Sequence, residues 1–194
     1  MLKKRIIGVI PIYNNQVVQS FKYKKTLPLG NPKIFVENLD RWCVDEIVVI
    51  DFSASKNNNG PNFELIQELG KIIKNTPTAY GGGIRNSDDA VKIINLGFER
   101  IVIDNLYLKK PDNIIKISEN IGSQAIILSL PLDINNKNIS HYNYLEKKKI
   151  KLDLNKLNHF KKFFSEIMII DYKNEGSDGK FNQKLLNKFL EFTK

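Results

Sequence analysis

Cysteine and histidine are scarce in this chain of 194 residues: it has one cysteine, Cys43, and two histidines, His141 and His159. A single cysteine excludes a framework of disulfides within the chain. The two histidines are isolated and lack the spacing of metal ligands, so we expect no metal site and no cofactor. Cys43 follows Trp42 at the predicted end of a helix, and we expect its thiol to be packed rather than nucleophilic.

Long apolar runs are also absent. Hydrophobic residues make up 42% of the chain, but no run approaches the ~20 residues that cross a bilayer. The apolar start, MLKKRIIGVIPIY, is not followed by the small-residue cleavage site of a signal peptide. We therefore interpret it as the first strand of a cytoplasmic protein that does not enter a membrane.

The chain has an excess of positive charge, with a formal net charge of +9, which raises the question of a nucleic-acid partner. The lysines are spread over many segments, and the densest run, at 147–149, falls in a predicted connection. No nucleic-acid motif accompanies them. The sequence therefore predicts no nucleic-acid binding.

Short apolar runs alternate with amphipathic segments along the chain. The runs are apolar almost throughout, which is typical of parallel strands buried on both faces. Helical patterns lie between them, the first opening at Pro32 with Asn31 as its cap. The predicted strands are residues 5–12, 46–51, 76–80, 100–103, 124–130 and 166–171, and the other predicted helices are 63–73, 87–96, one opening at 111–112, 154–164 and 181–192.

This succession of about six β–α units predicts one α/β domain, residues 1–194, with a parallel sheet. Spacing alone leaves a doubly wound sheet and a barrel open. The segments MLKKRII, VDEIVVIDFSAS, AYGGGIRNSDDA and GSQAIILSL resemble the cyclase subunit of imidazole glycerol phosphate synthase, a lyase of histidine biosynthesis. The resemblance runs from residue 1 to about 182 and implies a (βα)8 TIM-barrel-like fold.

The segment FKYKKTLPLGNP, residues 21–32, is similar to a variant branch of that family. In that branch a cyclase-like barrel and a glutaminase supply ammonia for the amidation of a bacterial surface sugar. The family's seventh and eighth units have no counterpart here, and a barrel lacking two strands has open edges. Either six strands close differently, another subunit covers the gap, or the chain is a remnant.

Two prolines, Pro11 and Pro131, occupy the positions where the resemblance implies the two catalytic aspartates. Proline has no proton to donate or accept, so the resemblance leaves open whether this chain is an enzyme. Asp51, at the end of the second predicted strand, is a possible acid–base residue. The alternative is that Asp51 accepts hydrogen bonds from nearby loop amides.

The resemblance also implies two phosphate-binding loops. Glycines let backbone amides approach a phosphate closely, although a glycine run also suits a tight turn. Asp104 replaces the first residue of the family's Asn-Thr pair, and an aspartate repels phosphate unless a cation intervenes. The positions that match phosphate-binding residues are Gly81, Gly82, Gly83, Asn105, Gly176 and Ser177.

Four charged residues open predicted strands: Arg5, Glu46, Arg100 and Glu166. Charges that face inward must pair to avoid a large desolvation cost. The resemblance matches them to the family's salt-bridged gate, with arginine in place of lysine at position 100, through which ammonia enters from the glutaminase. The alternative is that they are solvated charges in loops before buried strands.

Three functions follow as hypotheses. The first choice is a cyclase-inactive, cyclase-like subunit that forms a heterodimer with a glutaminase and receives its ammonia for surface-polysaccharide sugar amidation, with a phosphorylated small molecule as a possible ligand. The second is a functional cyclase of histidine biosynthesis. The third is a noncatalytic remnant or interaction subunit.

Overall fold

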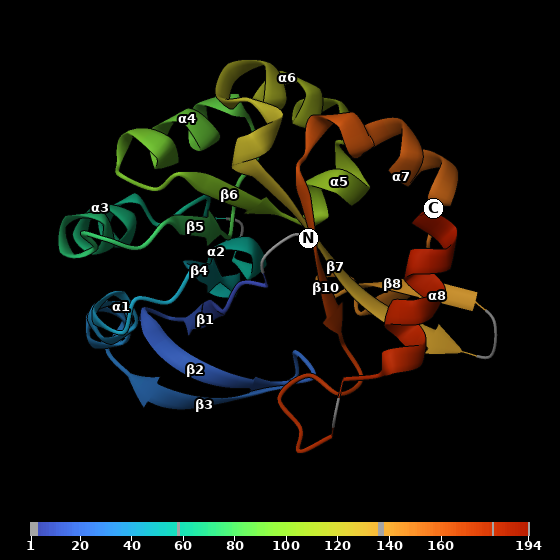
Figure 1. Cartoon of the computed structure of the whole chain (residues 1–194), viewed down its shortest axis with the longest axis horizontal. Coiled ribbons are helices and arrows are strands. Elements are labelled where there is room, and N and C mark those ends of the chain that lie inside the picture. Colours follow the sequence, from blue (N-terminus) through green and yellow to red (C-terminus); the bar gives the residue numbers. More distant parts are fainter. Residues whose placement is uncertain (1–3, 58, 136–137, 180, 194) are drawn as a thin grey trace.

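The computed structural model describes residues 4–57, 59–135, 138–179 and 181–193, and shows one curved sheet with helices on its outside (Figure 1). Six strands of the sheet run parallel and follow one another in chain order. This is the TIM-barrel-like α/β arrangement that the sequence predicts. The parallel strands are β1 (Ile7–Tyr13), β4 (Glu46–Asp51), β5 (Thr78–Gly81), β6 (Arg100–Ile103), β7 (Ile126–Asn135) and β10 (Glu166–Asp171).

The helices between the strands begin where the sequence provides caps. The Asn31 side chain accepts a hydrogen bond from Lys33 N at 2.9 Å, and Pro32 occupies the first turn of the following helix, as a helix start favours. The helices are α1 (Pro32–Arg41), α2 (Phe52–Lys56), α3 (Phe63–Ile72), α4 (Ser87–Asn95), α5 (Asn105–Lys109), α6 (Asp112–Ile121), α7 (Leu154–Phe160) and α8 (Gln183–Thr193).

The sheet has two apolar faces with different neighbours. Its outer face packs against the helices through residues such as Ile47, Val49 and Ile101, which are fully buried. Its inner face, here called the lumen, is filled by a smaller cluster of alternate residues. The lumen cluster consists of Val48, Ala79, Val102 and Ile127, with Ile50 and Met168 packed against it.

One side of the lumen is open. Among the described residues, β10 pairs only with β7, and β1 pairs with β4 and β2 but not with β10. The β1 side chains that face the lumen are exposed, Ile7 by 38% and Val9 by 52%. A cleft of about 380 Å³ lies there, lined by Val9, Pro11 and Met168 among others. This side opening is where an eight-stranded barrel would place two further strands.

Two hairpins extend the sheet beyond the predicted strands. The first is β2 (Gln16–Phe21) with β3 (Lys25–Gly30), and the second is β8 (Asn138–Asn143) with β9 (Lys148–Lys151). In the three-residue connection between β2 and β3, Lys22 and Tyr23 have φ of +53° and +58°, and Lys24 N donates to Phe21 O at 2.9 Å, as in a tight turn with two left-handed central residues. Neither residue is a glycine, so the turn signal in the sequence is weak.

The sequence-based expectation was wrong in several details. The lysine run at 147–149 enters strand β9 rather than lying wholly in a connection, and the helix expected to reach residue 164 ends at Phe160 before a 3₁₀ turn (Lys161–Phe163). Cys43 is exposed, not packed. It has φ of +54° in the turn that follows α1, and this turn carries its side chain away from the core.

The described part of the chain has no helix that combines the length and the apolar character needed to cross a membrane.

Candidate functional site

The four charged residues at the strand starts meet in one closed ring, here called the charge ring. Arg5 Nη1 lies 3.3 Å from Glu46 Oε2, and Arg5 Nη2 lies 2.7 Å from Glu166 Oε2. Arg100 Nη1 completes the ring at 3.1 Å from Glu46 Oε1 and 3.1 Å from Glu166 Oε1. Each cation therefore contacts both anions across the N-terminal end of the lumen.

Burial differs strongly around the charge ring. The Glu46 side chain is 1% exposed and that of Arg100 is 12% exposed, whereas Arg5 and Glu166 are 40% and 38% exposed. Burial by itself would raise the pKa of Glu166, but the hydrogen bonds and charges of Arg100 and Arg5 lower that pKa below its usual value. The ring therefore has a buried half and a half that reaches solvent.

The two prolines lie at the opposite end of the strands. Pro11 is paired in register with Ile50 of β4, and Pro131 with Ile170 of β10. Since Ile50 lines the lumen and side chains alternate along a strand, Pro11 has the same lumen-facing register. Both positions are at the C-terminal end of the barrel, where barrel enzymes place their catalytic groups, and neither proline can transfer a proton.

Asp51 is used as a helix cap. Its Oδ1 accepts hydrogen bonds from Ser53 N at 3.0 Å, Ser53 Oγ at 2.6 Å and Ala54 N at 3.1 Å. The residue is 2% exposed. These contacts stabilise the start of α2, so the geometry matches the alternative in which Asp51 bonds to nearby loop amides.

The glycine run after β5 makes a close turn. Gly82 and Gly83 have φ of +135° and +70°, and a side chain at Gly82 would collide with the carbonyl oxygen of Asp51. Gly83 N donates a hydrogen bond to Ser55 Oγ at 2.9 Å. That amide is therefore already paired within the protein, and the run serves a tight turn.

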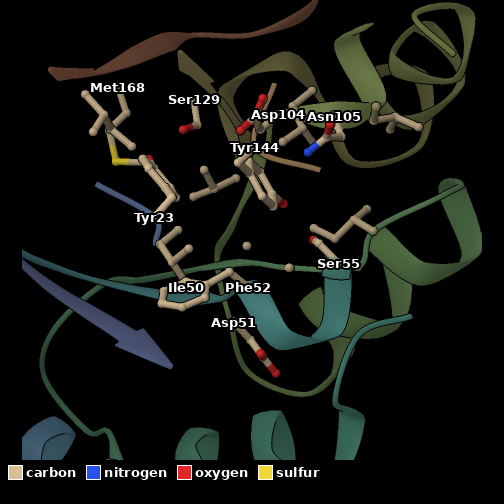
Figure 2. Close-up of a pocket in the computed structure, with 18 residues that line it drawn as sticks. Tyr23, Ile50, Asp51, Phe52, Ser55, Asp104, Asn105, Ser129, Tyr144 and Met168 are labelled. Atoms are coloured by element: carbon tan, nitrogen blue, oxygen red, sulfur yellow. Dashed lines mark hydrogen bonds between the residues drawn. The ribbon is translucent and has the colours of Figure 1, made fainter. Parts of the chain in front are cut away.

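These segments surround a cavity of about 80 Å³, here called the strand-end pocket (Figure 2). Figure 2 shows Asp104, Asn105, Ser129 and Tyr144 on one side of it, with Ser55 and Phe52 across from them. Its polar lining residues are Tyr23, Asp51, Ser55, Asp104, Asn105, Ser129 and Tyr144, together with the glycines Gly81, Gly82 and Gly83.

Asp104 is the central charged group of the strand-end pocket. Its Oδ1 lies 3.1 Å from Nε2 of His141, which is 1% exposed. Burial raises the pKa of the Asp104 carboxyl, and the contact with His141 opposes that shift. Sequence reasoning treated His141 as isolated because its partner is 37 residues away. Only the β7–β8 hairpin brings the two together.

Tyrosines from both hairpins cover the strand-end pocket. Tyr23, at the β2–β3 turn, stacks on Tyr144 with ring centroids 5.7 Å apart, and Tyr142 stacks on Tyr172 at 4.1 Å. Glu175 holds the β2–β3 turn, because its Oε2 accepts from Tyr23 N at 3.2 Å. Burial is the main cause that raises the pKa of Tyr23 and that of Tyr144. The sequence offered no motif for this cluster.

The second predicted phosphate loop lies elsewhere. Gly176 has φ of +67° and packs so closely on Ser20 of β2 that a side chain would strike the Ser20 carbonyl oxygen. The Ser177 hydroxyl donates to Asn174 O at 2.7 Å. Neither Gly176 nor Ser177 lines the strand-end pocket. The structure thus groups Gly81, Gly82, Gly83 and Asn105 but separates Gly176 and Ser177 from them.

Comparisons with known proteins identify the family of the chain. Residues 5–194 match the model of the family described as "Histidine biosynthesis protein". The chain is 32% identical over 192 residues to the "Putative imidazole glycerol phosphate synthase subunit hisF2" of Campylobacter jejuni, which is 97% of this chain and 75% of that protein. It is 31% identical over 130 residues to the "Imidazole glycerol phosphate synthase subunit HisF" of Natranaerobius thermophilus, which is 67% of this chain and 51% of that protein.

A "Putative imidazole glycerol phosphate synthase subunit HisF" of Leptospira borgpetersenii is 32% identical, again over 130 residues and 51% of its length. The chain thus spans about half the length of several curated relatives it matches. The family model nevertheless matches almost all of this chain, and the chain belongs to the family of histidine biosynthesis proteins, with relatives among imidazole glycerol phosphate synthase HisF subunits.

Proposed function

We propose that this protein is a cyclase-like subunit that receives ammonia from a glutaminase partner and does not catalyse the cyclase reaction. The observation that supports this most is the charge ring. Arg5, Glu46, Arg100 and Glu166 form a closed set of ion pairs at the N-terminal entrance of the lumen. The resemblance matches the same four positions to the gate through which ammonia enters.

The lumen behind the charge ring suits neutral ammonia. Its lining is apolar, with Val48, Ala79, Val102 and Ile127 at its centre. An apolar passage disfavours charged and strongly hydrated species, so it would admit NH₃ more readily than ammonium. Arg5 is the more exposed cation of the ring, and a partner that displaces its side chain would open the entrance.

The residues at the C-terminal end of the strands support the proposal that the protein does not catalyse the cyclase reaction. Pro11 and Pro131 offer no acid or base there, and Asp51 is committed to the cap of α2. General acid–base catalysis needs a titratable group within hydrogen-bond reach of the reacting atom. With these three positions unable to supply one, the cyclase reaction is not the expected chemistry.

The acceptor and the location are finer parts of the proposal. The segment FKYKKTLPLGNP runs from the last residue of β2 through the turn and β3 to the start of α1, and its likeness to the variant branch favours the amidation of a surface-polysaccharide sugar. We further propose a heterodimer with the glutaminase in the cytoplasm and a phosphorylated small molecule as a possible ligand.

The test measures glutamine hydrolysis by a purified family glutaminase with and without this protein. We expect binding and faster hydrolysis. Arg5→Ala and Glu46→Ala should change the coupling between hydrolysis and ammonia delivery while the protein stays folded. Lys33→Ala is the matched control, because Lys33 forms an exposed ion pair with Glu68 at 3.0 Å away from the ring. Absence of binding and of stimulation would refute the proposal.

A direct assay separates the cyclase alternative. A functional cyclase would convert the family's phosphorylated ribulosyl substrate with added ammonium salt, without any glutaminase. We expect no product at high ammonium. Product formation would overturn the cyclase-inactive assignment. It would not affect the conclusion on glutaminase binding, which the hydrolysis assay tests separately.

The side opening between β1 and β10 favours one further candidate, an interaction subunit or remnant. Exposed strand edges and apolar residues such as Val9 promote association. This candidate predicts an oligomer or poor solubility in sedimentation experiments. A stable monomer that binds the glutaminase tightly would exclude it.

A further inference from the structure

The strand-end pocket has an electrostatic character opposite to that of a phosphate site. Asp51 and Asp104 both line it, and among the described residues no lysine, arginine or histidine does. Arg85, Lys109 and Lys110 line a different, adjoining cleft of about 220 Å³. The Asp104 carboxylate repels a phosphate group and attracts a cation, whereas the Asp51 side chain points away from the cavity and caps α2 (Figure 2).

The pocket also contains polar atoms that lack partners within the protein. Ser129 is 5% exposed and lines the pocket, and no described residue forms a hydrogen bond with its hydroxyl. Its register opposite Met168, a lumen residue, directs it inward. The Asn105 side chain is likewise enclosed at Oδ1 and Nδ2 without a hydrogen bond of good geometry, although it lies near enough to the Tyr144 hydroxyl to oppose the rise in the pKa of Tyr144. Buried polar groups are rarely left unpaired, so these atoms point to a ligand that pairs with them.

Asp104 retains capacity for a ligand. Among the described residues the one hydrogen-bond partner of its carboxylate is His141 Nε2, which contacts Oδ1. A carboxylate has two oxygens and accepts several hydrogen bonds. Asp51, in contrast, already accepts three hydrogen bonds at Oδ1. Asp104 is therefore the carboxylate that is available to a ligand.

The tyrosines that line the pocket favour ammonium-type cations over metal ions. Tyr23 and Tyr144 stack at 5.7 Å and both line the pocket, and aromatic faces attract ammonium-type cations. A metal ion of the magnesium or calcium class needs several oxygen ligands, and no group of three His, Cys, Asp or Glu side chains suited to a metal occurs in the described part of the chain. The cavity of about 80 Å³ admits only a small ligand.

We propose that the strand-end pocket binds a small ammonium-type cation, held by the Asp104 carboxylate, the Ser129 hydroxyl and the Asn105 carbonyl group. The inference rests on the proposed function, because the pocket shares Ile50, Val102 and Met168 with the lumen and thus lies at the far end of the path from the charge ring. Ammonia that leaves the lumen there would take a proton from water, releasing hydroxide to the solvent, and be held as ammonium, or the amino group of a ligand would occupy the same place.

The experiment titrates the purified chain alone with ammonium chloride, methylammonium chloride and sodium chloride at constant ionic strength. Two signals are followed, the thermal midpoint of unfolding and the tyrosine difference absorbance, since Tyr23 and Tyr144 contact the pocket. We expect ammonium to raise the midpoint by about 2–4 °C once it exceeds its Kd about fivefold, with a saturable tyrosine signal. Sodium should give neither change.

Variants assign the effect to the pocket. Asp104→Asn should abolish the ammonium-specific shift, and Ser129→Ala should weaken binding about fivefold or more. Ser129→Ala keeps the Asp104–His141 contact and so remains informative if Asp104→Asn fails to fold. Asp88→Asn, which removes an exposed carboxylate on α4, is the control and should leave the shift unchanged. A response to methylammonium as strong as to ammonium would support the ligand-amine source, and a response to ammonium alone would support delivered ammonia.

Equal responses to ammonium and sodium would overturn the inference, and so would a shift that survives both pocket substitutions. Stabilisation by inorganic phosphate that Asp104→Asn strengthens would show an anion site and overturn it as well. Because no glutaminase is present, failure here leaves the docking result untouched. Conversely, Arg5→Ala should disturb docking but leave the ammonium titration unchanged, which keeps the two failures distinguishable.

Discussion

Removal of Arg100 should destabilise the protein strongly, because it leaves Glu46 buried with one partly exposed cation. Arg100 Nη1 contacts Glu46 and Glu166 at 3.1 Å each, and Nη2 donates to Ser165 Oγ at 3.0 Å. Glu46 is 1% exposed. Breaking a buried pair by deleting one partner costs about 3–5 kcal/mol, a large share of the ~5–15 kcal/mol that typically separates folded from unfolded protein. Arg100→Met, which keeps the apolar stem, should therefore lower the free energy of unfolding by about that amount.

A double-mutant cycle isolates the interaction. We would measure the free energy of unfolding by urea titration for the native protein, Arg100→Met, Glu46→Gln and the double variant. The double variant should be more stable than the sum of the single losses predicts, with a coupling of about 0.5–3 kcal/mol. Lys33→Met, which breaks an exposed ion pair, should cost less than about 1 kcal/mol. A loss for Arg100→Met no larger than for this control, or additivity within about 0.5 kcal/mol, would refute the reasoning.

Two further predictions concern the pH dependence of stability and the backbone strain at a glycine. Asp133, between Lys149 and Lys173, and Glu166 have lowered pKa values, since their cationic partners outweigh burial. A depressed folded-state pKa adds stability above the unfolded pKa of about 4, and that stability is lost as the pH falls through the folded value. Urea titrations from pH 6 to 3 should show this decline, and a flat profile would contradict it. Gly82→Ala should cost more than about 1 kcal/mol, because φ is +135° and a Cβ would collide with the Asp51 backbone. Gly179→Ala, whose Cβ would meet only side-chain atoms, the nearest being Ser177 Oγ at 3.2 Å, should cost less by the same measurement.

The strand and helix order was predictable because it depends on local patterns. Continuous apolar runs indicated the six parallel strands, and caps such as Asn31 marked helix starts. The hairpins were missed because their turns use residues such as Lys22 and Tyr23 in place of glycine. Their strands have no strong apolar alternation of their own, and their position follows from the strands that they pair with.

The two candidate sites also differ in how far they can be predicted from the sequence. The sequence has a charged residue at the start of four predicted strands. Parallel strands bring their starts to one edge, so the meeting of Arg5, Glu46, Arg100 and Glu166 follows from topology. The strand-end pocket does not follow from any spacing. Its Asp104–His141 contact joins residues 37 positions apart, and its Tyr23–Tyr144 stack joins two hairpins.

The sequence by itself determined the order of the elements, the absence of an acid or base at Pro11 and Pro131, and the signs of the charges at the strand starts, because these depend on residue type and local periodicity. Only the tertiary structure decided that β1 and β10 do not pair with each other in the described part of the chain, that Asp51 caps a helix, and that Asp104 meets His141. Each of these features depends on which groups from distant segments pair through a hydrogen bond or an ion pair. Those groups meet only when the sheet is curved and the hairpins cover its end.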